Sequence, residues 1–369
     1  MMESIGLTWG IVPDLVEMLV KVAFIFAVTM GFFAPILGYV ERKQSALMQD
    51  RIGANRADFM GYTFGGLLHI LADAIKLLVK EDFVPRGADK LLHFIAPFIS
   101  VVPALIAFTV IPFGGEYNLW GHKTNLVIAD LDVGILFIFA VASLGTYGAV
   151  IGGWASNNNW SLLGAIRVGS QMLSYEVAMG LSLVGVFMVY DSLRLTDIAM
   201  AQENFFSWGI FLQPLGFFLF FTCALAENKR MPFDAPEAES ELVAGYFTEY
   251  SGLKFAMFWM AEFLEIVTIG GILTTLFFGG WHIPFVTHDG LVTFMGNFLG
   301  ENFAQVATML VHVGVFWLKV VILIYIQMLI RWTLPRFRYD QIMKLGWKII
   351  LPLSLLNILI TGVVILAVN

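Results

Sequence analysis

The sequence predicts an all-α integral membrane protein with about eight transmembrane helices and one interfacial amphipathic helix. Of its 369 residues, 59% are hydrophobic and only 13% are charged, which is about half the charged fraction of a soluble domain. The mean hydropathy is +0.81, and long apolar runs recur along the chain. This composition excludes a secreted enzyme, a nucleic-acid-binding protein and a disordered scaffold.

Eight apolar runs of about 18 residues or more are long enough to span a bilayer as helices. They cover residues 18–40, 91–113, 132–154, 172–190, 210–226, 256–279, 306–332 and 347–368. The connections between them are short and contain no low-complexity segment. Residues 1–369 are therefore expected to form a single polytopic domain.

Basic residues orient the predicted bundle. Seventeen of the 21 Lys and Arg residues fall in four connections, 41–90, 155–171, 227–255 and 331–348. The connections of the opposite side carry only Lys123 and Arg194. The positive-inside rule then predicts that the four basic connections are cytoplasmic and that both termini lie on the outer, periplasmic side.

Residues 60–81 fit neither a span nor a loop. His69, Asp73, Lys76 and Lys80 follow one another at steps of four, three and four on an otherwise apolar helix. Such a stripe is typical of an amphipathic helix in the interface plane. Two interpretations remain open: the helix only packs against the bundle, or Asp73 and Lys76 face an internal cavity.

An ionisable residue inside a span costs about 3 kcal/mol at the bilayer centre, and four such residues are candidates for a function. Lys319 is near the middle of the seventh span, Glu176 is about one turn into the fourth, and Glu262 and Glu265 are in the sixth. Glu176 can reach the surface along its own stem. For Lys319 we expect a buried partner or a water-filled path.

The connection 227–255 is the most acidic part of the chain. Between residues 227 and 249 it contains two bases, Lys229 and Arg230, and six acids: Glu227, Asp234, Glu237, Glu239, Glu241 and Glu249. Crowded carboxylates in a poorly hydrated place raise one another's pKa and can exchange protons near neutrality. The pattern suits a proton relay or a cation site, and spacing alone does not separate them.

Several other chemistries are not expected. A single cysteine, Cys223, excludes a disulfide framework, a self-contained iron–sulfur cluster and a Cys-type zinc site. Among six histidines only His312 lies well inside a span, so a bis-His haem is not expected. We find no Gly-rich phosphate loop, no Ser–His–Asp set and no metal motif.

Three long segments resemble one family. They are YVERKQSALMQDRIGANR (39–56) with GLLHILADAIKLLVKED (66–82), then AENKRMPFDAPEAESELVAGYFTEYSG (226–252), and RWTLPRFRYDQIMKLGWKIILPLSL (331–355). They are similar to the quinone-chamber membrane subunit of respiratory complex I, which is the H subunit of bacterial NADH–quinone oxidoreductase and the counterpart of mitochondrial subunit 1. The chain departs from that family's pattern at Gly53-Ala54-Asn55, where Gly-Pro-Asn is common, and at His69-Ile70, where Gln-Pro is common.

The resemblance implies a membrane subunit of a proton-pumping NADH–quinone oxidoreductase in the bacterial inner membrane. Quinone would be the substrate, and this chain itself would bind no flavin, haem, iron–sulfur cluster or metal. Its partners would be other membrane subunits and peripheral iron–sulfur subunits that dock on the cytoplasmic connections. The isolated chain is not expected to oxidise NADH.

The resemblance also assigns residues, none of them catalytic in the sense of making or breaking covalent bonds. The quinone chamber would be lined by Glu41, Arg42, Asp73, Lys76, Glu227, Arg230 and Asp234. The proton relay would comprise Glu176, Glu237, Glu239, Glu241, Glu249 and Glu262. Lys319 is added to the relay because of its position inside a span, whereas Glu265 matches no clear family acid.

Two alternatives remain at this stage. The ion-translocating subunit of membrane-bound nickel–iron hydrogenases is related, but it carries Thr-His-Leu-Glu where this chain has Glu239-Ser240-Glu241-Leu242. A stand-alone ion-coupled transporter would also contain buried acids. Transporters typically show internal repeats, and we find no convincing repeat here.

Overall fold

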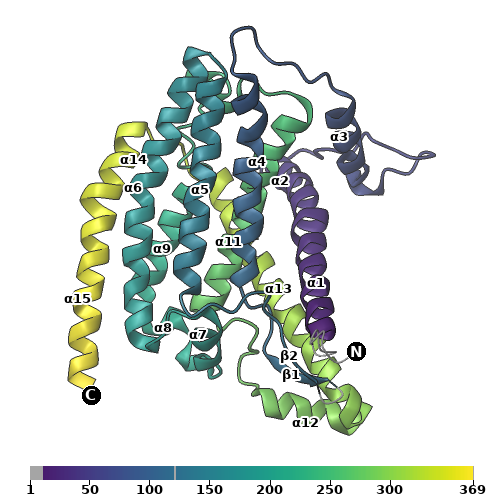
Figure 1. The fold of residues 1–369 in the computed structure, drawn as a ribbon, viewed down its shortest axis with the longest axis vertical. Helices are drawn as coiled ribbons and strands as arrows, with labels where there is room; N and C mark the ends of the chain where they lie inside the picture. The colour runs from purple at the N-terminus through teal and green to yellow at the C-terminus, as the bar shows by residue number, and fades with distance from the viewer. Residues whose placement is uncertain (1–10, 120–121, 369) are drawn as a thin grey trace, which may run out of the picture.

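The computed structural model describes residues 11–119 and 122–368, and within them the chain is almost entirely helical. Long helices run side by side along the longest axis of the molecule (Figure 1). Seven helical segments are long and apolar enough to cross a membrane: Leu15–Met48, Lys90–Val110, Gly134–Ala155, Asn159–Tyr190, Gly252–Phe277, Phe303–Thr333 and Tyr339–Val368. The predicted helical membrane class is confirmed.

The fifth predicted span is shorter than expected. Residues 209–227 form two pieces, α8 (Gly209–Leu212) and α9 (Pro214–Glu227), and α9 has 14 residues. A span needs about 20 residues when it stands perpendicular to the bilayer. The helix is interrupted at Gln213, because Pro214 lacks the N–H that would continue the ladder. The described chain thus holds seven helices of spanning length, not the predicted eight.

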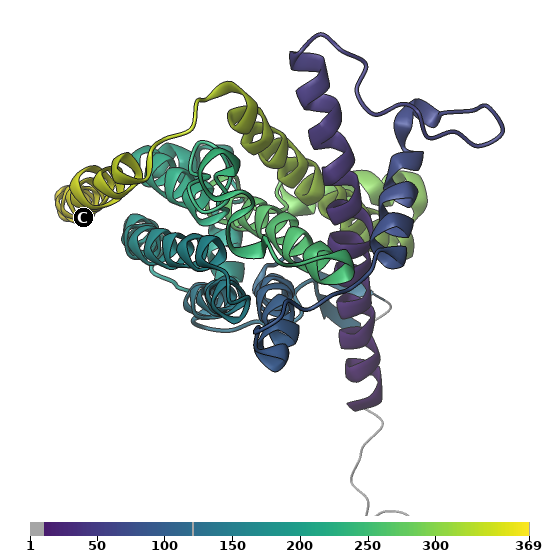
Figure 2. The ribbon, with the colours of Figure 1, turned by 90° about the horizontal axis from the view of Figure 1, so that it is seen from above.

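The N-terminal helix is one long, tilted rod at the edge of the bundle (Figure 2). It comprises α1 (Ile11–Phe26), a π-helical stretch over Ala27–Phe33, and α2 (Ala34–Met48). Its outer face exposes large apolar side chains such as Leu19 and Phe32. That exposure suits contact with lipid, since lipid tails are as apolar as these side chains.

α11 (Gly252–Phe277) is the central helix, with most of its side chains buried. It packs against α4 (Lys90–Ala107) and α13 (Glu301–Thr333). The remaining long helices complete the bundle on the other side: α5 (Gly134–Ala155), α6 (Asn159–Tyr190), α9 and α15 (Leu351–Val368). Ionisable residues on α11 are therefore held inside the protein and away from lipid.

The two ends of the bundle carry different elements (Figure 1). α3 (Leu68–Val79) and α14 (Tyr339–Leu345) lie at one end, in two of the basic connections. At the other end lie α7 (Leu195–Ala201), α12 (His288–Leu299) and an antiparallel hairpin of β1 (Glu116–Leu119) and β2 (His122–Asn125). No strand was expected from the sequence.

The amphipathic helix predicted over 60–81 begins later, at Leu68. A 3₁₀ turn covers Phe64–Gly66, and Gly61, Gly65 and Gly66 all have positive φ angles. At Gly66 a Cβ atom would lie 1.9 Å from the carbonyl oxygen of Ala54, so this close approach requires glycine. These glycines are the reason that the helix does not extend further toward the N-terminus than Leu68.

The acidic connection between α9 and α11 is a compact, ordered segment. It includes α10 (Glu239–Leu242) and a 3₁₀ turn over Gly245–Phe247. The amide of Gln171 on α6 donates hydrogen bonds of 2.8 Å to the carbonyls of Ala226 and Phe233. The buried amide thus fixes the beginning of the connection against α6.

Candidate functional site

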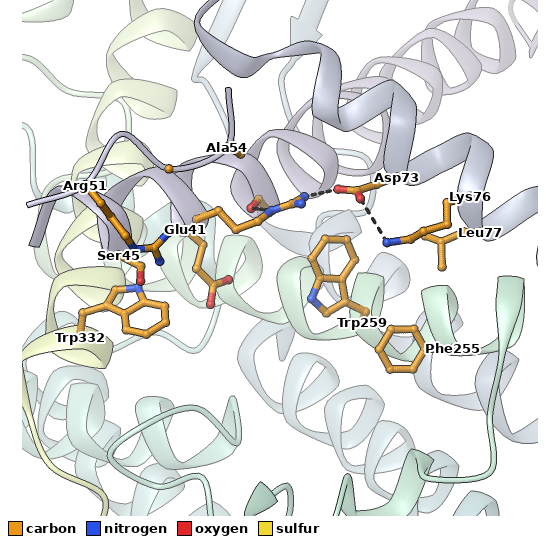
Figure 3. Close-up of a pocket in the computed structure, with 13 residues that line it drawn as sticks. Glu41, Ser45, Arg51, Ala54, Asp73, Lys76, Leu77, Phe255, Trp259 and Trp332 are labelled. Atoms are coloured by element: carbon orange, nitrogen blue, oxygen red, sulfur yellow. Dashed lines mark hydrogen bonds and ion pairs between the residues drawn. The ribbon is translucent and has the colours of Figure 1, made fainter. Parts of the chain in front are cut away.

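A large cavity opens where α2, α3 and α11 meet. Its volume is about 720 Å³, within the range of about 300–1,000 Å³ that is typical of ligand pockets. Figure 3 shows side chains that line it. The lining residues are Gly38, Glu41, Arg42, Ser45, Arg51, Gly53, Ala54, Asp73, Lys76, Leu77, Phe255, Trp259 and Trp332.

Charged side chains of α2 and α3 face one another across this cavity. Arg42 forms an ion pair with Asp73, and the Nζ atom of Lys76 lies 3.5 Å from Oδ1 of Asp73 (Figure 3). The Nε2 atom of His69 accepts hydrogen bonds from the backbone N–H groups of Arg56 and Ala57. The polar stripe of α3 therefore faces the cavity and the loop that precedes it, as the second interpretation of 60–81 predicts.

A second, smaller cavity adjoins the first. Its volume is about 220 Å³, and it shares Arg42, Asp73, Leu77 and Trp259 with the larger cavity. The rest of its wall is apolar and comes from the same three helices: Ala34, Pro35, Ile70, Ala74, Leu78, Leu253, Ala256 and Met260. The larger cavity, with its charged side chains, and the smaller, mostly apolar cavity thus meet at the indole ring of Trp259.

Glu41 connects the chamber to a buried network of charges. Arg230 donates a hydrogen bond of 2.8 Å to Oε2 of Glu41, and Arg331 forms an ion pair with Oε1 of the same carboxylate. The second terminal nitrogen of Arg230 lies 3.5 Å from Glu262, and its guanidinium stacks 4.4 Å from the ring centroid of Phe263. Each buried charge has an opposite partner, which compensates its loss of hydration.

The acidic connection adds carboxyl groups to this network. The hydroxyl of Tyr246 donates to Glu262 at 3.2 Å, and a hydrogen bond also joins Glu237 to Glu262. Two carboxyl groups can share a hydrogen bond only if one of them is protonated. Burial, followed by repulsion from Glu262, raises the pKa of Glu237 well above its usual range, so Glu237 takes up a proton more readily than an exposed carboxyl group does.

Asp234 lies nearby but does not line the large cavity. Arg336 donates a hydrogen bond of 2.9 Å to its carboxylate. Burial raises the pKa of Asp234, and the guanidinium of Arg336 opposes that rise. Thus, of the residues predicted for the quinone chamber, Glu41, Arg42, Asp73 and Lys76 line the large cavity, whereas Glu227, Arg230 and Asp234 lie outside its wall.

A third group of charges lies deeper in the bundle. Lys229 is only 4% exposed and lies 3.8 Å from Glu265. Glu227 and Glu265 line a small cavity of about 50 Å³ between α4, α5, α6, α9 and α11. Glu176 accepts a hydrogen bond from the hydroxyl of Ser143, and it interacts electrostatically with Glu227. Glu176 is therefore half-buried and hydrogen-bonded to α5.

Two predicted relay acids, Glu241 and Glu249, lie apart from these groups. Glu241 is 51% exposed and pairs with Arg167 at 2.7 Å. Glu249 accepts a hydrogen bond of 2.6 Å from the amide of Asn158. The side chain of Glu239 lies outside the described residues.

Lys319 has a buried partner, but that partner is the backbone. Its ammonium donates to the carbonyl oxygens of Phe278 at 2.7 Å, Gly280 at 3.0 Å and His282 at 2.6 Å. It also lies 4.5 Å from the ring centroid of Trp208. These carbonyls follow the C-terminal end of α11, where a cation is favoured by the helix dipole. No contact with a predicted relay carboxylate is found for Lys319 in the described chain.

Sequence reasoning missed three bases of the site. Lys229 was noted only as a base of the acidic connection, and Arg331 and Arg336 only as bases of the last connection. The available signal was position, because Lys229 lies two residues after Glu227 and Arg331 is the second-last residue of the seventh predicted span. Glu265, whose role was left open, pairs with Lys229.

The arrangement is suited to pass changes of charge between neighbouring groups. Among residues 11–119 and 122–368, no group of three or more His, Cys, Asp or Glu residues could hold a metal ion. Alternating buried acids and bases make the protonation of one group dependent on its neighbours. A change of charge in the large cavity would therefore be felt along the network that begins at Glu41.

Comparisons with known proteins agree on one family. A family described as NADH dehydrogenase matches residues 20–362. The NADH-quinone oxidoreductase H subunit 1 of Geobacter metallireducens is 46% identical over 95% of this chain and 96% of its own length. The NADH-quinone oxidoreductase H subunit 2 of Geobacter sulfurreducens is 46% identical over 97% and 99%. The NADH-quinone oxidoreductase H subunit 1 of Cytophaga hutchinsonii is 43% identical over 96% and 98%.

Proposed function

Because this chain belongs to the NADH dehydrogenase family, with relatives named as H subunits of NADH-quinone oxidoreductase, we propose that it forms most of the quinone chamber of such a complex. It is a multi-pass membrane subunit of that enzyme complex and functions with other subunits. In this proposal it also links quinone reduction to proton translocation through its buried carboxyl groups.

One observation carries the proposal: the cavity of about 720 Å³ has a charged wall and connects through Glu41 to buried Arg230. A quinone headgroup accepts hydrogen bonds, which Arg42 and Lys76 can donate. The adjoining apolar cavity of about 220 Å³ suits the hydrocarbon tail of such a substrate. Trp259 lines both cavities and would contact the headgroup and the tail.

Quinone reduction takes up two protons and passes through negatively charged species. A negative charge in a poorly hydrated chamber raises the proton affinity of nearby carboxylates and stabilises cations. Glu41 would respond first, because it lines the cavity and also contacts Arg230 and Arg331. Arg230 would then pass the change in potential to Glu262 and Glu237.

The remaining members of the proposed relay extend from this network. Glu176 continues it into the bundle beside Ser143, and Glu227 contributes a carboxyl group next to it. Glu239, Glu241 and Glu249 would exchange protons with the cytoplasmic surface. Lys319 would belong to the outer end of the path, beyond the C-terminal end of α11.

The topology completes the proposal. The pair α8 and α9 would form the eighth crossing, with a break at Gln213, so that both termini lie on the periplasmic side of the inner membrane. Peripheral iron–sulfur subunits would dock on the four basic connections. This chain would bind quinone as substrate but no flavin, haem, iron–sulfur cluster or metal. Neither a hydrogenase subunit nor a stand-alone transporter is favoured by any contact described above.

Labelling with a photoreactive quinone tests the proposal in the assembled complex. Label should appear on peptides that contain Phe255, Trp259 or Trp332, and an excess of unlabelled quinone should remove it. Peptides with the exposed apolar Phe294 of α12 provide the control for nonspecific labelling in lipid. Equal labelling of both sets, unaffected by competing quinone, would contradict the assignment of this cavity.

A further inference from the structure

Glu265 is a buried carboxylate to which the resemblance assigns no role. It lies on α11 three residues after Glu262, so the two side chains share one face of the helix. Its side chain is 18% exposed, and its Oε2 atom lies 3.8 Å from Nζ of Lys229, beyond hydrogen-bond distance. An acid inside a membrane bundle is costly and needs a reason.

The small cavity beside Glu265 contains a second carboxylate, that of Glu227. Its volume of about 50 Å³ exceeds the ~10–15 Å³ that one water needs. The rest of its wall is mostly apolar, with Ile138, Phe220 and Ile272 among the lining residues. The Oε2 atoms of Glu227 and Glu265 are both buried and have no hydrogen-bond partner within the described chain.

Glu265 also lies between two groups of acids. It interacts electrostatically with Glu262, which belongs to the network of Glu41 and Arg230. It also interacts with Glu227, which in turn interacts with Glu176. Its interactions therefore connect the two groups of acids.

We propose that Glu265 transfers protons between Glu262 and Glu227 and so joins the chamber network to the acids inside the bundle. In each step one carboxyl O–H bond breaks and one forms on the next carboxylate or on water in the small cavity, and no electrons move. The proposal rests on the proton-relay function given above. It adds the connection between the two halves of that relay.

A simpler role for Glu265 would be to balance the charge of Lys229. The two roles predict different results for a double variant. If Glu265 only neutralises Lys229, Lys229→Met with Glu265→Gln removes both charges and should restore proton translocation. If Glu265 carries protons, translocation should stay low in the double variant.

Gly145 offers a direct rescue. It lines the small cavity from α5, and a Cβ atom built there would meet only Oε1 of Glu265, at an ordinary contact distance of 3.7 Å. Gly145→Asp can therefore introduce a new carboxylate into the same cavity when Glu265 is replaced. Gly145→Asn, nearly identical in shape, cannot carry a proton and is the matched control.

The measurement is proton translocation per quinone reduced in membrane vesicles that hold the assembled complex. Glu265→Gln should lower it about tenfold, less than the ~10²-fold or more that a sole proton-transfer group contributes, because water in the cavity can partly substitute. The combination Glu265→Gln with Gly145→Asp should recover translocation, and the combination with Gly145→Asn should not.

Two outcomes overturn the proposal: normal translocation in Glu265→Gln, or restored translocation in the Lys229→Met and Glu265→Gln pair. If Glu265→Gln alone does not assemble, two combinations still test the proposal. They are Lys229→Met with Glu265→Gln, and Glu265→Gln with Gly145→Asp. Glu262→Gln and Glu176→Gln are measured in parallel. If these two lower translocation and Glu265→Gln does not, only this inference fails, and if none of the three has an effect, the relay itself is refuted.

Discussion

Gly38 is the position at which the smallest change should alter the chamber most. It lies on α2 and faces the indole of Trp259, which lines both cavities. A Cβ atom added to Gly38 would lie 2.5 Å from Cη2 and 2.9 Å from Cζ2 of that ring. Gly38→Ala should therefore displace Trp259 and change the width of the chamber.

The size of the effect follows from these distances. Carbon atoms that are not bonded pack at about 3.5–4.0 Å, so the ring must move by about 1 Å. Overpacking of this kind costs about 1–3 kcal/mol, which corresponds to roughly 5- to 150-fold in affinity. Neither the charges of the network nor the helix propensity of α2 is disturbed, because alanine is a strong helix former.

The assay is steady-state quinone reduction by membranes that contain the assembled complex. Gly38→Ala should raise the quinone KM by about tenfold, the middle of that range, with unchanged amounts of complex. Gly31→Ala is the matched control, because a Cβ atom at Gly31 would meet nothing within 4 Å. If both variants show the wild-type KM, Trp259 does not border the quinone path and the reasoning is refuted.

Three further results are expected. Arg230→Gln should destabilise the assembled complex by about 3–5 kcal/mol, because it removes the buried cation that pairs with Glu262, and adding Glu262→Gln should recover part of that loss in thermal inactivation. A hydrogen bond and ion pair with Arg194 lower the pKa of Asp130, so this contact stabilises the fold above the pKa of the unfolded carboxyl, about 3.9, and the stabilisation is lost as pH falls through the lowered folded value. Asp130→Asn should abolish this loss of stability at acidic pH. If the stability of wild type and variant depends on pH in the same way, the prediction is contradicted. Glu241→Gln should leave copurification of partner subunits unchanged, since exposed pairs contribute under about 1 kcal/mol, while lowering turnover, and unchanged turnover would remove Glu241 from the relay.

The helical architecture could be predicted because the length of each apolar run decides whether it forms a membrane-spanning helix. Apolar length alone identifies a span, and seven of the eight predicted runs have a matching helix of spanning length. The run 210–226 differs because Pro214 interrupts a segment whose hydropathy is uniform. Hydropathy records no hydrogen bonds, so it could not reveal the break at Gln213.

Polar residues of the cavity wall, such as Glu41 and Asp73, could be named from the sequence, but their contacts could not, and the role of each residue stays a prediction. Periodicity on α3 correctly identified the face that carries Asp73 and Lys76. It could not reveal that Glu41 on α2 meets Arg230 from a connection 189 residues away. Contacts between helices depend on how the helices pack, and a single sequence gives the face of each helix without its neighbour.

The three carbonyl contacts of Lys319 restrict how quickly a proton could pass through its ammonium group. An ammonium group has three N–H donors, and all three are occupied. Releasing one proton there would leave a peptide oxygen near the C-terminal end of a helix without its N–H donor. Proton transfer through Lys319 would therefore be slower than proton exchange among the carboxyl groups at the opposite end of the bundle.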